Sequence, residues 1–239
     1  METEMITLEI NGKTVEVPKG TTILNAAKAA HIKIPTLCYH PDLRAGASCG
    51  ICVVRQLVPS RNPADNGKLV PSPKLLRACC TEATPGMHIV THDPDIVQVR
   101  KTVLELILAN HPNDCLQCPR SGRCELQSLA ADFGIRENPF PKEVLHHESD
   151  TSTPSIVLYP DKCIKCGRCA EVCQEMQNVW ALEFIGRGEK TVRTGPRGSL
   201  IPKGLCGWHL SSRGEVRSTT VNIGNCHWSM EDLWVVCMP

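Results

Sequence analysis

Cysteine spacing carries the strongest chemical signal in this sequence, which has 15 cysteines among 239 residues. The first residues include acids and no apolar stretch of the kind that directs secretion, so we expect reduced thiols rather than a disulfide scaffold. Reduced cysteines at short, regular spacings are typical ligands of metals and of iron–sulfur clusters. Three groups with such spacings follow one another along the chain, and each predicts a separate centre.

The first group has the spacing Cys-x10-Cys-x2-Cys and is followed by two adjacent cysteines further along. Its loop over 44–52 is rich in small residues, which let backbone N–H groups reach the sulfur atoms of a [2Fe–2S] cluster. Plant-type ferredoxins have four residues where this loop has ten, so the spacing indicates a variant. Cys79 and Cys80 both qualify as the last ligand, but in a strand they would point to opposite faces, so only one should bind and the other should pack. The predicted ligands are Cys38, Cys49, Cys52 and one of Cys79 and Cys80.

The second group combines one histidine with three cysteines in the spacing His-x3-Cys-x2-Cys-x5-Cys. Pro112, Pro119 and Gly122 supply the turns that would wrap this segment around a [4Fe–4S] cluster. Zinc is the chemical alternative, because three thiolates and one imidazole also suit that metal. A histidine in place of a fourth thiolate removes one negative charge and should raise the reduction potential. The predicted ligands are His111, Cys115, Cys118 and Cys124.

The third group has the Cys-x2-Cys-x2-Cys-x3-Cys spacing of bacterial ferredoxins, in which the fourth cysteine ligates the other cluster of a two-cluster protein. A second run of this kind is not recognisable downstream. Cys173 therefore binds either a second cluster or, by local rearrangement, the same cluster as Cys163, Cys166 and Cys169. If Cys173 does not bind that same cluster, its fourth ligand must come from Cys206, Cys226 or Cys237. The predicted ligands are Cys163, Cys166 and Cys169, with Cys173 and Cys206 as further candidates.

A hairpin and several short strands are predicted to position the first group. Residues 5–10 and 14–17 flank Asn11-Gly12, which is the preferred pair for a two-residue type I′ turn. Further strands are expected at 51–57, near residue 75 and at 88–91.

Helices and an insertion complete the expected elements. A short helix over 23–31, capped by Thr21 or Thr22, has small residues that let it lie close to a sheet. Four prolines make residues 58–74 a predicted surface insertion. Two further helices are expected, one over 95–110 capped by Asp93 with Pro94 in its first turn, and one over 124–133.

The serial order of the three groups resembles the N-terminal iron–sulfur region of iron-only hydrogenase catalytic subunits and the 75-kDa-type iron–sulfur subunit of complex I. Related subunits occur in NAD(P)-linked electron-bifurcating hydrogenases and transhydrogenases. The resemblance covers residues 6–186 and is strongest in four motifs. The motifs are Leu37-Cys-Tyr-His40, Ala47-Ser-Cys-Gly-Ile-Cys52, His111-Pro-Asn-Asp-Cys115 and Gly122-Arg-Cys-Glu-Leu-Gln127. The resemblance also implies that Cys79 is the fourth [2Fe–2S] ligand.

The resemblance also implies an α+β fold with serial domains. Iron-only hydrogenases continue into a hydrogen-activating domain, and because this chain ends before one we expect a relay without a catalytic head. The expected parts are a β-grasp [2Fe–2S] domain over 1–92, a small helical His/Cys3 domain over 93–137, a linker over 138–155, an incomplete bacterial-ferredoxin-like segment over 156–190 and an irregular tail, non-native or truncated, over 191–239.

Electron transfer is therefore the expected function, with one [2Fe–2S], one His-ligated [4Fe–4S] and one or two further [4Fe–4S] clusters. By resemblance the partners are a flavin/NAD(P)-binding iron–sulfur subunit, a small [2Fe–2S] subunit and ferredoxin. A net charge of +1 argues against nucleic acid, and no apolar run is long enough for membrane insertion, so a cytoplasmic location is expected. No self-contained substrate site is seen, and Gly-x-Gly-x-x-Gly is absent. The alternatives are a metal-binding structural or assembly protein without electron transfer, and a fragment of an iron-only hydrogenase.

Overall fold

The computed structural model describes residues 4–62, 65–140, 149, 159–178, 180, 182–186 and 191–194, and the chain forms two compact units. None of the helices in these described residues is long and apolar enough to cross a membrane. The first unit comprises Met1–Tyr39, Ala45–Leu106 and Ser121–Phe140, and the second comprises His40–Arg44, Ile107–Arg120 and Pro141–Pro239.

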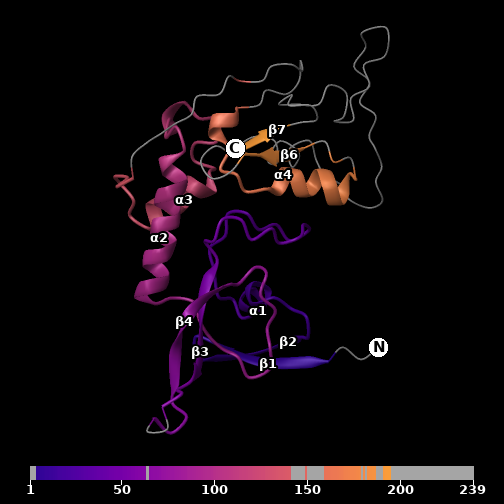
Figure 1. Ribbon diagram of the computed structural model, residues 1–239, viewed down its shortest axis with the longest axis vertical. Coiled ribbons are helices and arrows are strands. Elements are labelled where there is room, and N and C mark those ends of the chain that lie inside the picture. The colour runs from indigo at the N-terminus through magenta and orange to yellow at the C-terminus, as the bar shows by residue number, and fades with distance from the viewer. Residues whose placement is uncertain are drawn as a thin grey trace. The chain divides into compact units, whose positions relative to one another are not determined.

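A five-stranded mixed sheet lies at the centre of the first unit (Figure 1). Its strand order is β2-β1-β5-β3-β4, with β1 and β5 parallel and the other neighbours antiparallel. Together with the helices this arrangement confirms the predicted α+β class. The strands are β1 (Met5–Ile10), β2 (Lys13–Pro18), β3 (Val53–Pro59), β4 (Leu69–Arg77) and β5 (His88–Val90).

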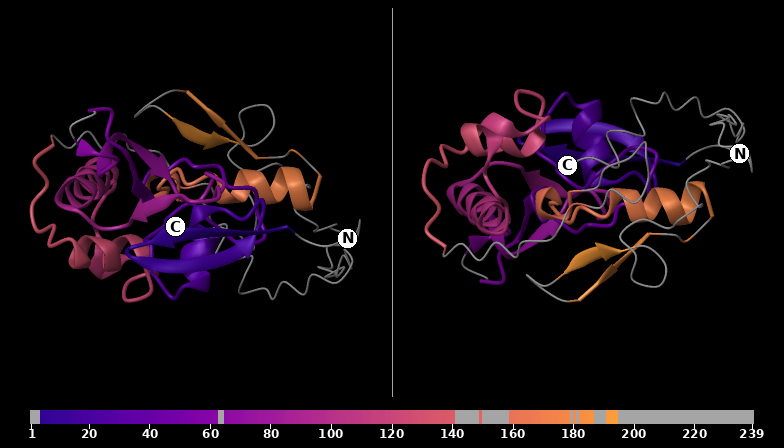
Figure 2. Two further views of the ribbon diagram at one scale, coloured as in Figure 1. Left: turned by 90° about the horizontal axis from the view of Figure 1, so that it is seen from below. Right: turned by 90° about the horizontal axis from the view of Figure 1, so that it is seen from above.

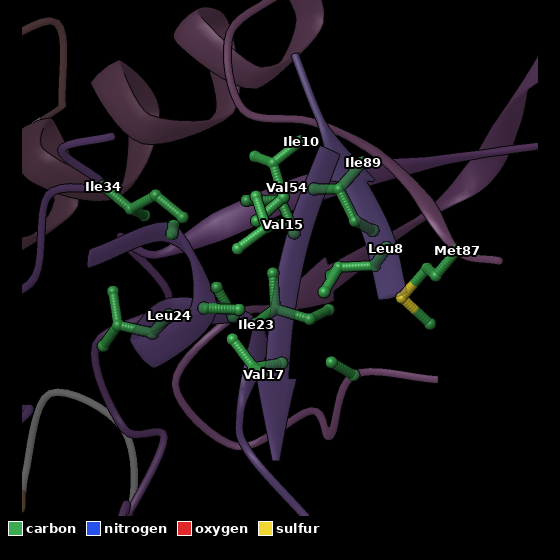
Figure 3. Packing of buried hydrophobic residues seen from close by; sticks show 14 of the residues in the cluster. Leu8, Ile10, Val15, Val17, Ile23, Leu24, Ile34, Val54, Met87 and Ile89 are labelled. Atoms are coloured by element: carbon green, nitrogen blue, oxygen red, sulfur yellow. The ribbon is translucent and has the colours of Figure 1, made fainter. Parts of the chain in front are cut away.

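The predicted hairpin and its helix form the core of this unit. Asn11 and Gly12 both have positive φ, 51° and 80°, as a type I′ turn requires. Helix α1 (Ile23–Ala29) is capped by Thr22, whose hydroxyl accepts a hydrogen bond from the Asn25 N–H. Its apolar side chains pack with alternate residues of β1 and β2, as Figure 3 shows for Leu8, Val17 and Ile23 among others.

The predicted insertion over 58–74 is wrong in part. Strand β3 continues to Pro59, and β4 begins at Leu69 and pairs antiparallel with it. Two of the prolines, Pro71 and Pro73, lie inside β4. They are tolerated because β4 is an edge strand, where a missing N–H interrupts at most one ladder.

The expectation that Cys79 and Cys80 lie in a strand is also wrong. Both residues lie in a turn directly after β4 and not in a strand. The turn nevertheless separates them: Cys79 is 1% exposed, whereas Cys80 lies at the surface.

Helix α2 (Pro94–Ala109) begins at the predicted cap, because Asp93 Oδ1 accepts a hydrogen bond of 2.8 Å from the Ile96 N–H. The buried Arg55 of β3 makes ion pairs of 2.9 Å with Asp93 and 2.8 Å with Asp95. These contacts fix the start of α2 against the sheet. The second predicted helix forms as α3 (Glu125–Asp132).

The second unit is built from short elements. A hairpin of β6 (Glu183–Ile185) and β7 (Val192–Thr194) lies beside α4 (Arg168–Glu171) and the π-helical turn η4 (Val172–Met176) (Figure 2). Strand β7 lies just beyond the predicted end of the ferredoxin-like segment, but it pairs with β6, which lies inside that segment. The 3-10 turns are η2 (Cys115–Gln117) and η3 (Pro160–Lys162). Most of the predicted linker and tail lies outside the described residues.

Candidate metal centres

Four thiols of the first unit come together at one end of the sheet. Cys38 and Cys49 lie in the loop before β3, Cys52 directly precedes β3, and Cys79 follows β4. The Cys38 and Cys49 side chains share a hydrogen bond, and so do those of Cys52 and Cys79. The four sulfur atoms therefore form two pairs.

Each pair shares its proton unequally. The Cys38 thiol donates to Cys49, which lowers the pKa of Cys49 to about 5 and raises that of Cys38. Cys79 donates in the same way to Cys52, so the pKa of Cys52 falls to about 7 and that of Cys79 rises. One thiolate is thus stabilised in each pair, and thiolates are the form that binds iron.

The loop backbone also directs N–H groups at these sulfur atoms. Cys38 accepts hydrogen bonds from the N–H groups of Ser48 and Cys49, and Cys49 accepts from that of Ile51. The loop turns through left-handed residues at Ala47, with φ of 50°, and at Gly50, with φ of 71°. Such N–H donors stabilise negative charge on a cluster and its thiolates.

The donor set fits a [2Fe–2S] cluster. Four thiolates bind two irons, so two pairs of sulfurs are the arrangement that such a cluster requires. Three of the four residues, Cys38, Cys52 and Cys79, are buried, which keeps water from the site. Among the described residues, no three His, Cys, Asp or Glu side chains converge on a single metal ion.

Cys80 takes no part in this group. Its Sγ lies 3.7 Å from the Arg77 carbonyl oxygen at the exposed end of the turn.

Arg100 is a residue of this region that sequence reasoning missed. It is 3% exposed, and its guanidinium donates to the carbonyl oxygens of Ile51 and Val53, on either side of Cys52. A signal existed: Arg100 lies four residues after Ile96 and four before Leu104, so it occupies the buried stripe of α2. A cation in an apolar stripe must find buried acceptors.

The second predicted group lies on short turns. Cys115 begins η2, Cys118 directly follows it, and Cys124 directly precedes α3 at its N-cap position. His111 follows α2, and its Nδ1 accepts a hydrogen bond of 3.3 Å from the Asn113 N–H, which orients the ring. Cys124 belongs to the first unit and the other three residues to the second, so their common cluster remains a prediction.

The third predicted group lies entirely in the second unit. Cys163 directly follows η3, and its Sγ accepts a hydrogen bond from the Lys165 N–H at 3.4 Å. Cys169 and Cys173, one helical turn apart, are buried together with Leu182. Burial raises the pKa of Cys166. The tail candidates Cys206, Cys226 and Cys237 lie outside the described residues.

An ion pair joins the second and third ligand segments. Lys162 Nζ lies 3.1 Å from Asp114 Oδ2, and these residues directly precede Cys163 and Cys115. The lysine holds the pKa of the Asp114 carboxyl below its usual value.

Three family models match the three ligand groups in order. Residues 3–94 match a 2Fe-2S iron-sulfur cluster binding domain, residues 100–139 match the NADH-ubiquinone oxidoreductase-G iron-sulfur binding region, and residues 156–175 match a 4Fe-4S binding domain. The chain therefore contains a [2Fe–2S] domain and [4Fe–4S] regions.

Similar proteins are subunits of hydrogenases and of NADH dehydrogenases. The NADP-reducing hydrogenase subunit HndD of Solidesulfovibrio fructosivorans is 44% identical over 77% of this chain and 30% of that protein. The NADH-ubiquinone oxidoreductase 75 kDa subunit of Reclinomonas americana is 33% identical over 78% of this chain and 25% of that protein. This chain thus spans a third or less of these two curated relatives.

The match to one solved structure covers a larger share of the other protein. A chain in the crystal structure of an NAD+-reducing [NiFe]-hydrogenase superimposes with a TM-score of 0.70 at 31% identity, over 82% of this chain and 77% of that one. The protein described here belongs to the family of iron–sulfur subunits of NAD(P)-linked hydrogenases and complex I-type NADH dehydrogenases.

Proposed function

We propose that this chain relays single electrons through three iron–sulfur centres of a larger, electron-bifurcating hydrogenase or transhydrogenase complex. When bound, the clusters supply the redox chemistry, and the chain supplies their ligands, hydrogen bonds and burial. The single observation that carries the proposal is the pairing of the four thiols in the first unit, at the head of three matched regions in serial order.

The ligands of the three centres are assigned as follows. The first pair of thiols, Cys38 and Cys49, holds one iron of the [2Fe–2S] cluster, and Cys52 and Cys79 hold the other. Burial of Cys173 one turn from Cys169 supports it as the fourth ligand of the last centre. The [4Fe–4S] ligands are His111, Cys115, Cys118 and Cys124 for the second centre, and Cys163, Cys166, Cys169 and Cys173 for the third.

The names of the relatives support the proposed partners. HndD is named as a subunit of an NADP-reducing hydrogenase, and the solved structure is that of an NAD+-reducing one. We infer that electrons pass between a flavin- and NAD(P)-binding subunit, with its small [2Fe–2S] subunit, and ferredoxin or a second catalytic subunit.

Metal content and EPR spectra test this function on the full chain purified without oxygen. The expected result is about ten iron atoms with matching sulfide per chain, and two-iron and four-iron signals on reduction with dithionite. A zinc-containing, EPR-silent protein would support the structural or assembly role instead.

The histidine ligand has a test of its own. We expect His111→Cys to retain the second cluster but to lower its reduction potential, because a thiolate adds a negative charge. Cys118→Ser is the comparison variant and should lose the cluster. An unshifted redox titration of the His111 variant would exclude histidine as a ligand.

A further inference from the structure

A buried cation lies next to the backbone around Cys52 but is not itself one of the proposed ligands. Arg100 of α2 is 3% exposed, and no carboxylate among the described residues lies within ion-pair distance of its guanidinium. Arg55 of β3, which is also buried, pairs with Asp93 and Asp95 and is therefore neutralised. Arg100 keeps a positive charge inside the protein.

The contacts of Arg100 bracket one proposed ligand. Its Nε donates to the Ile51 carbonyl oxygen at 3.0 Å and its Nη2 to the Val53 carbonyl oxygen at 2.7 Å, so both neighbours of Cys52 are held. Burial lowers the pKa of Arg100 to about 10, and the charges of Cys52 and, to a smaller extent, Asp93 act in the opposite direction. The side chain thus remains cationic at neutral pH and interacts electrostatically with the Cys52 thiolate.

We propose that Arg100 is a positioning residue that fixes Cys52 at the start of β3 and supplies the buried charge that raises the reduction potential of the first centre. The inference rests on the proposed [2Fe–2S] site. Reduction brings one electron from the donor to the site and no proton, so the site gains one negative charge. A buried cation stabilises that charge more than an exposed one does, because water and salt screen it less.

An EPR-monitored redox titration of the full cluster-loaded chain tests this role, with dithionite as reductant. In Arg100→Met we expect the ratio of reduced to oxidised [2Fe–2S] centre at a fixed ambient potential to fall about tenfold, which is 59 mV for one electron. Arg100→Lys retains the charge and should titrate close to the wild type. An unchanged potential in Arg100→Met would overturn the proposal.

Arg77→Met is the matched control, because Arg77 is an exposed cation two residues before the ligand Cys79. Its potential should shift much less, and a shift as large as that of Arg100→Met would overturn the proposal. If Arg100→Met binds no cluster, Arg100→Gln replaces it. A lower reduction potential in Arg100→Gln than in Arg100→Lys supports the role of charge. Equal potentials in these two variants, or loss of the cluster from both of them, overturn the proposal. A wild-type chain without a two-iron signal would instead refute the proposed function itself.

Discussion

The two units differ in what holds each of them together. In the first, strands β1, β2, β3 and β5 and helix α1 enclose a large cluster of aliphatic side chains, of which Cys52 and Cys79 are the only proposed ligands among the described members. In the second, the described core cluster consists of Cys169, Cys173 and Leu182, so two of its three members are proposed ligands. The first unit has an apolar core of its own, whereas we expect the described part of the second unit to depend on bound metal.

This difference has a general physical basis. Burial of aliphatic side chains stabilises a domain by about 25 cal/mol for each Å² of apolar surface, independently of any cofactor. A small segment without such a core obtains its folding free energy from cluster binding. We therefore expect the chain to combine a preformed site with a segment, residues 159–178, that folds on its cluster.

Removal of the iron should have the largest effect and would test the comparison directly. After treatment of the chain with a chelator and an oxidant, we expect residues 159–178 to lose amide protection while β1 and β2 retain it. Hydrogen exchange measured by mass spectrometry before and after the treatment gives the answer. Equal loss of protection in both units would contradict the difference drawn here.

A cavity in the apolar core should affect the first unit alone. Leu8 is 2% exposed and belongs to the apolar cluster, so Leu8→Ala should destabilise this unit by about 2–5 kcal/mol. Denaturation monitored by circular dichroism measures the change. The four-iron EPR signal of the third centre should be unaffected, and Thr14→Ala, an exposed change on β2, serves as the control.

Loss of the α2 cap should have a smaller effect within the first unit. Asp93→Ala removes the hydrogen bond to the Ile96 N–H and one carboxylate partner of Arg55, which should cost about 1–2 kcal/mol. Asp93→Asn keeps a capping oxygen and should recover part of that loss. Thermal melts of both variants separate the contribution of the capping hydrogen bond from that of the ion pair with Arg55. Identical melting temperatures for Asp93→Ala and Asp93→Asn would show that the cap is not needed.

The smallest effect is expected for Cys80→Ser. The side chain is exposed and its Sγ makes only a weak contact with the Arg77 carbonyl oxygen, so iron content and melting temperature should match the wild type. Cys79→Ser should abolish the two-iron signal under the same conditions. Loss of the two-iron cluster from the Cys80 variant would reverse the assignment of these neighbours.

Local patterns were sufficient to predict the elements whose cause is local. The Asn11-Gly12 turn and the caps at Thr22 and Asp93 are confirmed, because each depends on residues within a few positions. The strand expected near residue 75 is the end of β4, but the first part of β4, over 69–74, was assigned to an insertion. Pro71 and Pro73 are acceptable there only because β4 is an edge strand, and strand order is a property of the whole sheet.

The same distinction between local and long-range causes applies to the candidate sites. Spacing alone selected the four thiols that the structure brings together in two pairs, apart from the choice between Cys79 and Cys80. That choice depends on a turn after β4 which strand alternation could not describe. Arg100 was missed because its acceptors lie on β3, a strand distant in sequence, and only its position on the apolar stripe of α2 indicated burial.

The prolines of β4 have a consequence for association between molecules. An open sheet edge invites a strand from another copy to add to it through main-chain hydrogen bonds, which is a common route to aggregation. Two of the nine residues of β4 have no N–H to donate. An incoming strand would meet an incomplete ladder there, so we expect this edge of the sheet to resist strand addition between copies of the chain.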